Sequence, residues 1–197
     1  KSFLNFRNYN ELVIEILSVA NIVICGSKEQ QKQLLQYNTK VVIIPDFVVT
    51  ESLFSKNSFE LVDPRRVSIL WEGLSGGLAR IVIDLFKLLT TIDENILLNV
   101  VTDPKTHLIG DRYIATDTNK YLQKLAKKFG IEVRFWSWSK DNLNAAIENS
   151  DFGVIFIPTN DRIMQNKPEN KLVLLSSFGL PVLVSSTASY KRYLKSA

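Results

Sequence analysis

A group of polar residues stands directly before an apolar helix near the end of the sequence. In "NKPENKLVLLSSFGLPVLVSS", Lys167, Asn170 and Lys171 lie around Pro168. Proline suits the first position of a helix, which places Lys167 at the cap and leaves the next backbone amides without partners. Such amino ends favour anions, because their free N–H groups and the helix dipole attract negative charge. We expect a phosphate or diphosphate to bind here; the alternative is a solvated helix cap.

Glu169 lies in the first turn of the same helix. A carboxylate at this position already complements the helix dipole, so a bound anion alone does not account for it. We expect Glu169 to accept hydrogen bonds from ribose or sugar hydroxyl groups.

A second candidate is the glycine-rich turn in "WEGLSGGLARIVIDLFKLL". Gly73, Gly76 and Gly77 allow backbone amides to approach a bound group closely, and Arg80 lies one turn into the following helix. We expect these four residues to contact a diphosphate. The spacing is not G-x-G-x-x-G, so it does not indicate a dinucleotide cofactor. In the alternative interpretation the glycines only form a tight turn and Arg80 is a solvated helix residue.

The elements that must position these residues alternate between apolar strands and helices. Asp117 to Phe129 has its apolar positions on one helical face, with Gly130 as a carboxyl-terminal cap, and Ser27 with Gln30 forms a capping box. Strands without polar alternation are buried on both faces, as in a parallel sheet. The sequence predicts an α/β, Rossmann-like, doubly wound fold. Its expected strands are 22–25, 41–44, 67–71, 96–101, 131–135, 152–157 and 181–184.

The predicted domain arrangement follows from a polar interval without sustained period. We expect residues 1–45 to be the remnant of a preceding α/β domain, 46–65 a linker and 66–197 a ligand-binding domain. If the last five strands take the order 3-2-1-4-5, the order reverses between the first and the fourth, where open sheets bind ligands. The loops at that point are 72–77 and 158–167.

Several other residues have two possible interpretations. Trp136 and Trp138 follow the third of these strands and either flank a nucleotide base or only cover the sheet edge. His107 is expected in a loop, where it either touches a ligand or is a surface residue. Tyr190 either touches a ligand or belongs to the domain packing. Cys25 lies in a buried strand and is expected to be core.

Composition restricts the classes of partner. With 24 Lys and Arg against 20 Asp and Glu, the net charge of +4 is mild and scattered, which does not indicate nucleic acid. One cysteine, one histidine and no D-x-D pair predict no metal site. No apolar run approaches the ~18 to 20 residues of a membrane helix. The sequence opens on Lys1 in mid-pattern, so we expect a fragment of a longer protein.

These segments together resemble GT-B glycosyltransferases of the family 4 kind (group 1), which use nucleotide-sugar donors. "ANIVICGSKEQQKQLL" followed by "KVVIIPDFV" is similar to the end of the family's acceptor domain. "VSILWEGLSGGLARI", "ENSDFGVIFIP" and "KPENKLVLLSSFGLPVLVSS" are similar to its donor domain. The resemblance covers about residues 20–197, and the order and spacing of the segments carry it. It departs from the family at Pro45-Asp46-Phe47, which lacks a glycine.

The resemblance implies a nucleotide-sugar donor bound against residues 73–77 and 167–171, without a cofactor or metal. It implies transfer, with retention, to a glycan or lipid-linked acceptor in polysaccharide or glycoconjugate synthesis. The expected location is cytoplasmic, with possible peripheral association at the inner face of the membrane through the missing domain. Two glutamates usual in the family are replaced by Asn166 and Leu174, so the catalytic residues stay unassigned. A catalytically silent nucleotide-binding or interaction module is therefore the alternative.

Overall fold

A computed structural model of the 197-residue chain describes residues 6–45, 55–56, 60–92, 95–108, 114–158 and 165–196. The chain forms two compact units. The first contains residues 1–48, 159–170 and 186–197, and the second contains 49–158 and 171–185. The sequence-based boundaries at residues 45 and 66 stay a prediction. Among the described residues, no helix has both the length and the apolar character needed to cross a bilayer.

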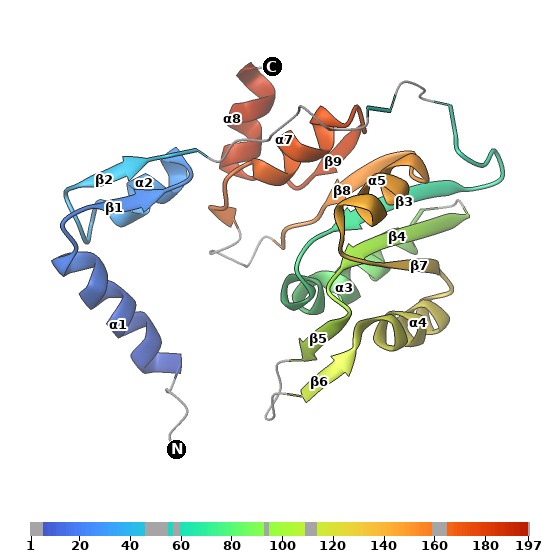
Figure 1. Ribbon diagram of the computed structural model, residues 1–197, viewed down its shortest axis with the longest axis horizontal. Coiled ribbons are helices and arrows are strands. Elements are labelled where there is room, and N and C mark those ends of the chain that lie inside the picture. The colour runs from blue at the N-terminus through green and yellow to red at the C-terminus, as the bar shows by residue number, and fades with distance from the viewer. Residues whose placement is uncertain are drawn as a thin grey trace. The chain divides into compact units, whose positions relative to one another are not determined.

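The second unit is built on a five-stranded parallel sheet (Figure 1). Its strand order, β7-β4-β3-β8-β9, is the predicted 3-2-1-4-5 order, so the reversal lies between β3 and β8. Every residue of β4, an interior strand of the sheet, is buried, as expected of a parallel strand covered on both faces. The strands are β3 (Val67–Glu72), β4 (Ile96–Thr102), β7 (Glu132–Ser137), β8 (Phe152–Ile155) and β9 (Val182–Val184).

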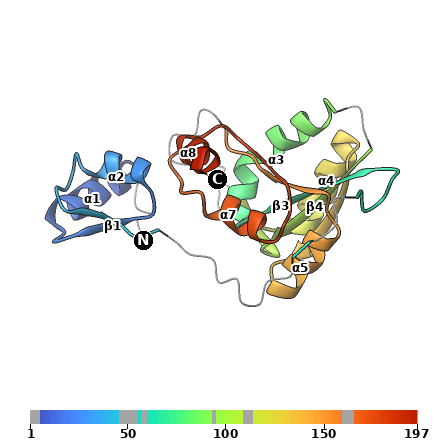
Figure 2. The ribbon, with the colours of Figure 1, turned by 90° about the horizontal axis from the view of Figure 1, so that it is seen from above.

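Helices cover both faces of this sheet. Figures 1 and 2 show α3 and α4 on one face and α5 on the other, and Figure 1 shows α7 on the side of α5. The α/β, doubly wound, Rossmann-like class predicted from the sequence is confirmed. The helices are α3 (Ser75–Leu89), α4 (Thr118–Phe129), α5 (Lys140–Glu148) and α7 (Asn170–Ser177).

The ends of these helices follow local chemistry. The Asp117 side chain accepts the Lys120 amide at 2.8 Å and caps α4, and Gly130 ends that helix in the left-handed conformation, with φ of 68°. Ser139 caps α5 by accepting the Asn142 amide at 3.1 Å. The capping residues therefore fix where each helix meets the sheet.

One part of the second unit differs from the sequence prediction. The segment after β4, expected to be a loop around His107, forms an antiparallel hairpin of β5 (Lys105–Leu108) and β6 (Ile114–Asp117). His107 pairs in register with Ala115, while its side chain lies outside the described residues. The prediction failed because these four-residue strands show no clear apolar alternation.

Among its described residues, the first unit contains a two-stranded parallel sheet with the helices α1, α2 and α8. A small core of Val23, Cys25 and Val41 is buried and packs against residues of α1, α2 and β2, which confirms the prediction for Cys25. Ser27 accepts the Gln30 amide at 3.1 Å, as the capping box predicts, and the Gln30 side chain accepts the Gly26 amide at 2.9 Å. The elements are α1 (Phe6–Val19), β1 (Val23–Cys25), α2 (Lys28–Leu34), β2 (Val41–Ile43) and α8 (Ala188–Ser196).

Candidate functional site

Lys171 and Glu72 meet at the carboxyl end of β3, in the second unit. The Lys171 ammonium donates to the Glu72 backbone carbonyl at 2.6 Å and lies 3.4 Å from its carboxylate oxygen Oε2. The same ammonium is 5.3 Å from the centre of the Trp71 ring, within cation–π range. These contacts fix the charge of Lys171 beside the strand-order reversal, where open parallel sheets bind ligands.

Gly73 leaves room for the Lys171 ammonium. A Cβ atom added to Gly73 would overlap Nζ of Lys171 and would lie 3.0 Å from the Trp71 ring. The Gly73 amide continues the sheet by donating to the Val101 carbonyl at 3.1 Å. The structure therefore brings together two of the predicted site residues, Gly73 and Lys171.

Gly76 and Gly77 lie in the first turn of α3 and have no packing reason to be glycine. A Cβ atom at either position would meet nothing within 4 Å, and neither residue has a positive φ. Glycine in a helix costs up to ~1 kcal/mol relative to alanine. The interpretation that these two glycines are required by a tight turn is therefore wrong, and their open surface leaves the backbone accessible.

The amino end of α3 has no side-chain cap of its own. Its N-cap residue is Leu74, which is 76% exposed and cannot accept a hydrogen bond through its side chain. The Ser75 amide instead donates to the Asp103 carboxylate at 3.0 Å. The amide of Gly76 has no acceptor among the described residues, so it is available to a ligand.

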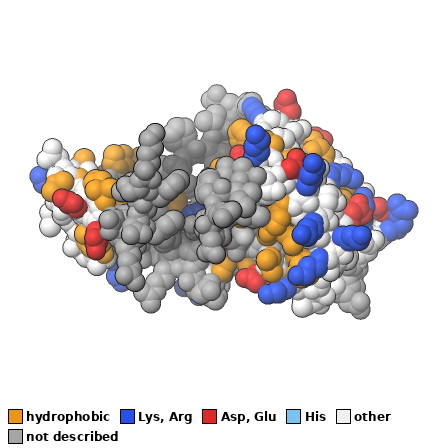
Figure 3. All heavy atoms as spheres, turned by 90° about the horizontal axis from the view of Figure 1, so that it is seen from below, with side chains coloured by type: hydrophobic (Ala, Val, Ile, Leu, Met, Phe, Trp, Pro, Cys, Tyr) orange, Lys and Arg blue, Asp and Glu red, His pale blue; other side chains and the backbone are white. Residues whose placement is uncertain are grey.

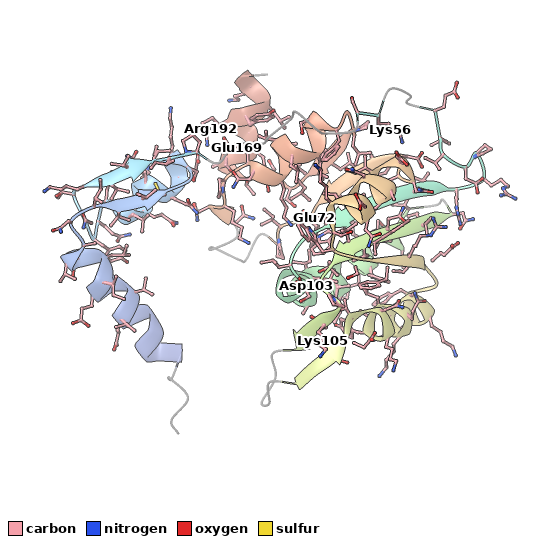
Figure 4. All side chains as sticks on the ribbon, viewed as in Figure 1. Lys56, Glu72, Asp103, Lys105, Glu169 and Arg192 are labelled. Carbon is pink, nitrogen blue, oxygen red and sulfur yellow. The ribbon has the colours of Figure 1, made fainter. Side chains whose placement is uncertain are left out.

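Asp103 belongs to a short network of hydrogen bonds between the end of β4 and the start of α3 (Figure 4). The Ser75 hydroxyl donates to the Lys105 carbonyl at 2.9 Å, and the buried Thr106 hydroxyl donates to the Ser75 carbonyl at 3.0 Å. These bonds orient the first turn of α3. Asp103 itself puts a carboxylate at this helix end, which limits the excess of positive charge there.

The loop before α7 differs from its predicted geometry. Helix α7 begins at Asn170, two residues later than predicted, so Pro168 is not its first residue and Lys167 is not its cap. Within the first unit, the Lys167 carbonyl accepts the Ser189 hydroxyl at 2.8 Å, and the Lys167 side chain is exposed. The predicted role of Lys167 and Asn170 toward a diphosphate stays a prediction.

Glu169 is held by Arg192 in the first unit (Figure 4). The Arg192 guanidinium donates to both carboxylate oxygens of Glu169 at 3.1 and 3.2 Å, and to both oxygens of Glu29 at 3.2 and 3.0 Å. Its hydrogen bonds lower the pKa of Glu29. Burial, with a smaller contribution from Glu169, raises the pKa of Tyr190 to about 12. Tyr190, 3% exposed, is a core residue of this unit.

The two candidate base-side tryptophans have different surroundings. Trp136 is half-buried, and its indole N–H donates to Oδ1 of the fully buried Asn99 at 3.0 Å. The Arg134 guanidinium lies 5.9 Å from the centre of the Trp136 ring. Trp138 follows the end of β7 and is 57% exposed. Trp136 therefore has a structural role, while the nucleotide-base role of both residues stays a prediction.

The remaining predicted residues add little geometry. Arg80 lies in α3, but its side chain is outside the described residues. Asn166 offers its backbone carbonyl to the Ser27 hydroxyl at 3.4 Å, and Leu174 lies in α7. No three His, Cys, Asp or Glu side chains of the described ranges come together as a metal site would require. The prediction of no metal stays untested.

Two open hollows of the second unit lie at the opposite edge of the sheet. One is lined by residues around Asn95, Ile96 and Gly130, and the other by residues around Arg66 and Arg134. Both are at the amino ends of the strands and contain none of the predicted site residues. In open parallel sheets the ligand site is at the carboxyl ends, so the Lys171 and Glu72 edge is the stronger candidate.

The fold matches solved structures of TarM, a GT-B glycosyltransferase. The crystal structure of TarM has a TM-score of 0.62 and 12% identity over 95% of this chain. A mutant of S. aureus TarM in complex with Fondaparinux, alpha-GlcNAc-glycerol and UDP has a TM-score of 0.61 and 11% identity over 95% of this chain. The chain has the Rossmann-like GT-B fold. It spans about a third of TarM, 34% and 35% of the two chains, and matches no family model and no curated protein.

Sequence reasoning missed Glu72, Asp103, Asn99 and Arg192. The sequence places Glu72 only at the start of a loop, although a charged residue at the end of an apolar strand is a usable signal. Asp103 gave a similar signal after β4. Arg192 gave none, because its partner Glu29 is 163 residues away in the sequence.

Proposed function

We propose that this chain is the donor-binding part of a glycosyltransferase, which binds the diphosphate of a nucleotide sugar at the carboxyl end of β3. The observation that carries the proposal is the pair Gly76 and Gly77, which are glycine without a packing reason. They lie at the start of the helix that follows β3, the strand whose end also carries Gly73 and the Lys171 ammonium. Accessible amides and a fixed cation are the groups that bind a diphosphate.

The chemistry that these groups supply is electrostatic. When a sugar leaves its nucleotide, negative charge develops on the diphosphate, and a preorganised cation with backbone N–H groups stabilises it. Lys171 is held in place by Glu72 and Trp71, so it needs little reorganisation. Arg80, Lys167 and Asn170 are proposed further contacts. Retention of configuration, independence of metal, a glycan or lipid-linked acceptor and a cytoplasmic location also belong to this proposal.

Calorimetric titration with UDP, GDP and their sugar conjugates tests the proposal. We expect one nucleotide family to bind, and Lys171→Ala to weaken its binding by about tenfold or more, which corresponds to about 1.4 kcal/mol. Gly76→Ala should also weaken binding, because its methyl group lies beside the open amide. Lys124→Ala, an exposed lysine of α4, is the matched control. If no nucleotide binds, or if Lys171→Ala binds like the wild type, the proposal is wrong.

A second candidate function is a catalytically silent nucleotide-binding module. It is favoured by Asn166 and Leu174, which stand where the family resemblance leads one to expect glutamates. The two functions differ in turnover, but a donor-binding part without its acceptor domain should bind without turning over. The test is therefore release of the nucleoside diphosphate from a bound nucleotide sugar, in the presence of glycan acceptors, by the enzyme of which this chain is the proposed donor-binding part. Binding without release favours the silent module, and release that depends on Lys171 favours the transferase.

A further inference from the structure

The carboxylate of Glu72 is placed where an anion site would not be expected to have one. Its oxygen Oε2 lies 3.4 Å from the Lys171 ammonium, and the Glu72 side chain is only 12% exposed. Lys171 is already held by the Glu72 backbone carbonyl and the Trp71 ring. The carboxylate is therefore not needed to keep Lys171 at the end of β3.

The second carboxylate oxygen of Glu72, Oε1, is open to a ligand. No described residue donates a hydrogen bond to it. Among the described residues, the buried side-chain atoms that lack a hydrogen-bond partner belong to Arg66, Thr102, Thr118 and Asn144. Oε1 of Glu72 also lacks a partner but is not one of these buried atoms, so it reaches solvent. A largely buried carboxylate that keeps one oxygen without a protein donor is an acceptor for hydroxyl groups brought by a ligand.

This carboxylate changes which anions the site favours. A bare diphosphate that reaches Lys171 also meets the negative charge of Glu72, which opposes binding in a partly buried site. A ligand with hydroxyl groups next to its phosphates can donate to Oε1 in a charge-assisted hydrogen bond, which offsets the repulsion. The pair Lys171 and Glu72 thus matches a phosphate ester of a sugar better than a simple phosphate anion.

We propose that Glu72 is a specificity-determining residue, whose carboxylate accepts hydrogen bonds from sugar hydroxyl groups of the ligand and excludes diphosphates without them. The proposal rests on the proposed function of the same site. The hydroxyl groups belong either to the ribose or to the transferred sugar, and both present the same chemistry to Oε1.

The test compares the wild type with Glu72→Gln, which keeps the size of the side chain and removes its charge. Four probes are titrated: inorganic pyrophosphate, UDP, 2′-deoxy-UDP and a UDP-sugar, or the guanosine series if that nucleotide binds. We expect Glu72→Gln to bind pyrophosphate about tenfold more tightly. The UDP-sugar should bind no more tightly than to the wild type, so the preference for the sugar ligand falls.

The other arms assign the hydroxyl donor. If Glu72→Gln weakens the binding of UDP and of the UDP-sugar equally but leaves the binding of 2′-deoxy-UDP unchanged, the ribose is the hydroxyl donor. If it weakens only the binding of the UDP-sugar, the transferred sugar is the donor. Glu148→Gln, an exposed carboxylate of α5, is the control, and thermal unfolding checks that Glu72→Gln is folded. If the wild type binds the nucleotide sugar but Glu72→Gln changes all four affinities by the same factor, the role of Glu72 is wrong. If the wild type binds no nucleotide sugar, the proposed function fails together with it.

Discussion

Arg192 binds the carboxylate of Glu169 through two hydrogen bonds of 3.1 and 3.2 Å, while the same guanidinium binds Glu29. In the first unit these contacts join α8, the loop before α7 and the first turn of α2. A ribose or sugar hydroxyl that binds Glu169, as the sequence predicts, therefore has to share the carboxylate with Arg192. The guanidinium is the element that holds the three segments together.

Arg192→Ala should destabilise the first unit. The substitution leaves two carboxylates without their donor, but the Arg192 side chain is 35% exposed, so water screens part of the loss. We expect a loss of about 1 kcal/mol in the free energy of unfolding, measured by urea denaturation. Lys191→Ala, exposed on the same helix, should change stability by less than about 0.5 kcal/mol. Equal effects of both substitutions would show that the network does not stabilise the fold.

Tyr190 should make the first unit less stable at alkaline pH. Its pKa is raised to about 12 in the folded protein, above the value of 10.0 of an unperturbed tyrosine. A raised pKa gives stability that is complete below pH 10 and is lost as pH rises toward 12, about 3 kcal/mol over this interval. Tyr190→Phe should remove this pH dependence, followed by circular dichroism and tyrosinate absorbance, whereas Tyr37→Phe should retain it. A wild-type stability that is flat between these pH values contradicts the prediction.

Asn99→Ala should strongly destabilise the second unit. Asn99 is completely buried, accepts from the Trp136 indole, and donates to the Asn149 carbonyl and to Oγ of Ser150, each at 3.0 Å. Its loss leaves buried polar atoms without partners, which should cost about 3 kcal/mol in urea unfolding. Trp136 fluorescence should change as well. The exposed Asn119→Ala is the control, and a similar small effect for both would contradict the role of Asn99.

Gly73→Ala should displace Lys171, because the new methyl group overlaps its ammonium. The free energy of unfolding should fall by about 1 to 2 kcal/mol, because the substitution displaces Lys171 and because the backbone φ of 157° suits glycine. In a double-mutant cycle, Lys171→Ala should remove the part due to overlap and leave the backbone part. Additive effects of the two substitutions would show that Gly73 and Lys171 are not coupled.

The sheet could be predicted from the sequence because its signals are local. The apolar runs of β3 and β4 need only their own composition to be recognised as buried parallel strands. Asp117 and Gly130 mark the two ends of α4 in the same local way. The order of the strands followed from the usual topology of such folds.

The site could be predicted only in part, because its contacts are long-range. The sequence indicates Gly73 and Lys171 separately, but the contact between them depends on the packed structure. The same holds for the contact of Lys171 with Glu72, because the two residues are 99 positions apart in the sequence. The late start of α7 was missed because a proline favours the first helical position without requiring it. The basic residues are scattered along the sequence and therefore do not predict a positively charged patch. Figure 3 shows Lys and Arg side chains lying among acidic and hydrophobic ones.

The first unit is discontinuous in sequence, since it combines residues 1–48 with 159–170 and 186–197. During synthesis, β1 and β2 leave the ribosome long before α8. Most of the second unit also emerges before α8. The contact between Arg192 and Glu29, which are 163 residues apart in the sequence, can therefore form only after α8 has emerged. This contact closes a loop of more than a hundred residues, so its entropy cost makes this step slow relative to the local folding of the helices.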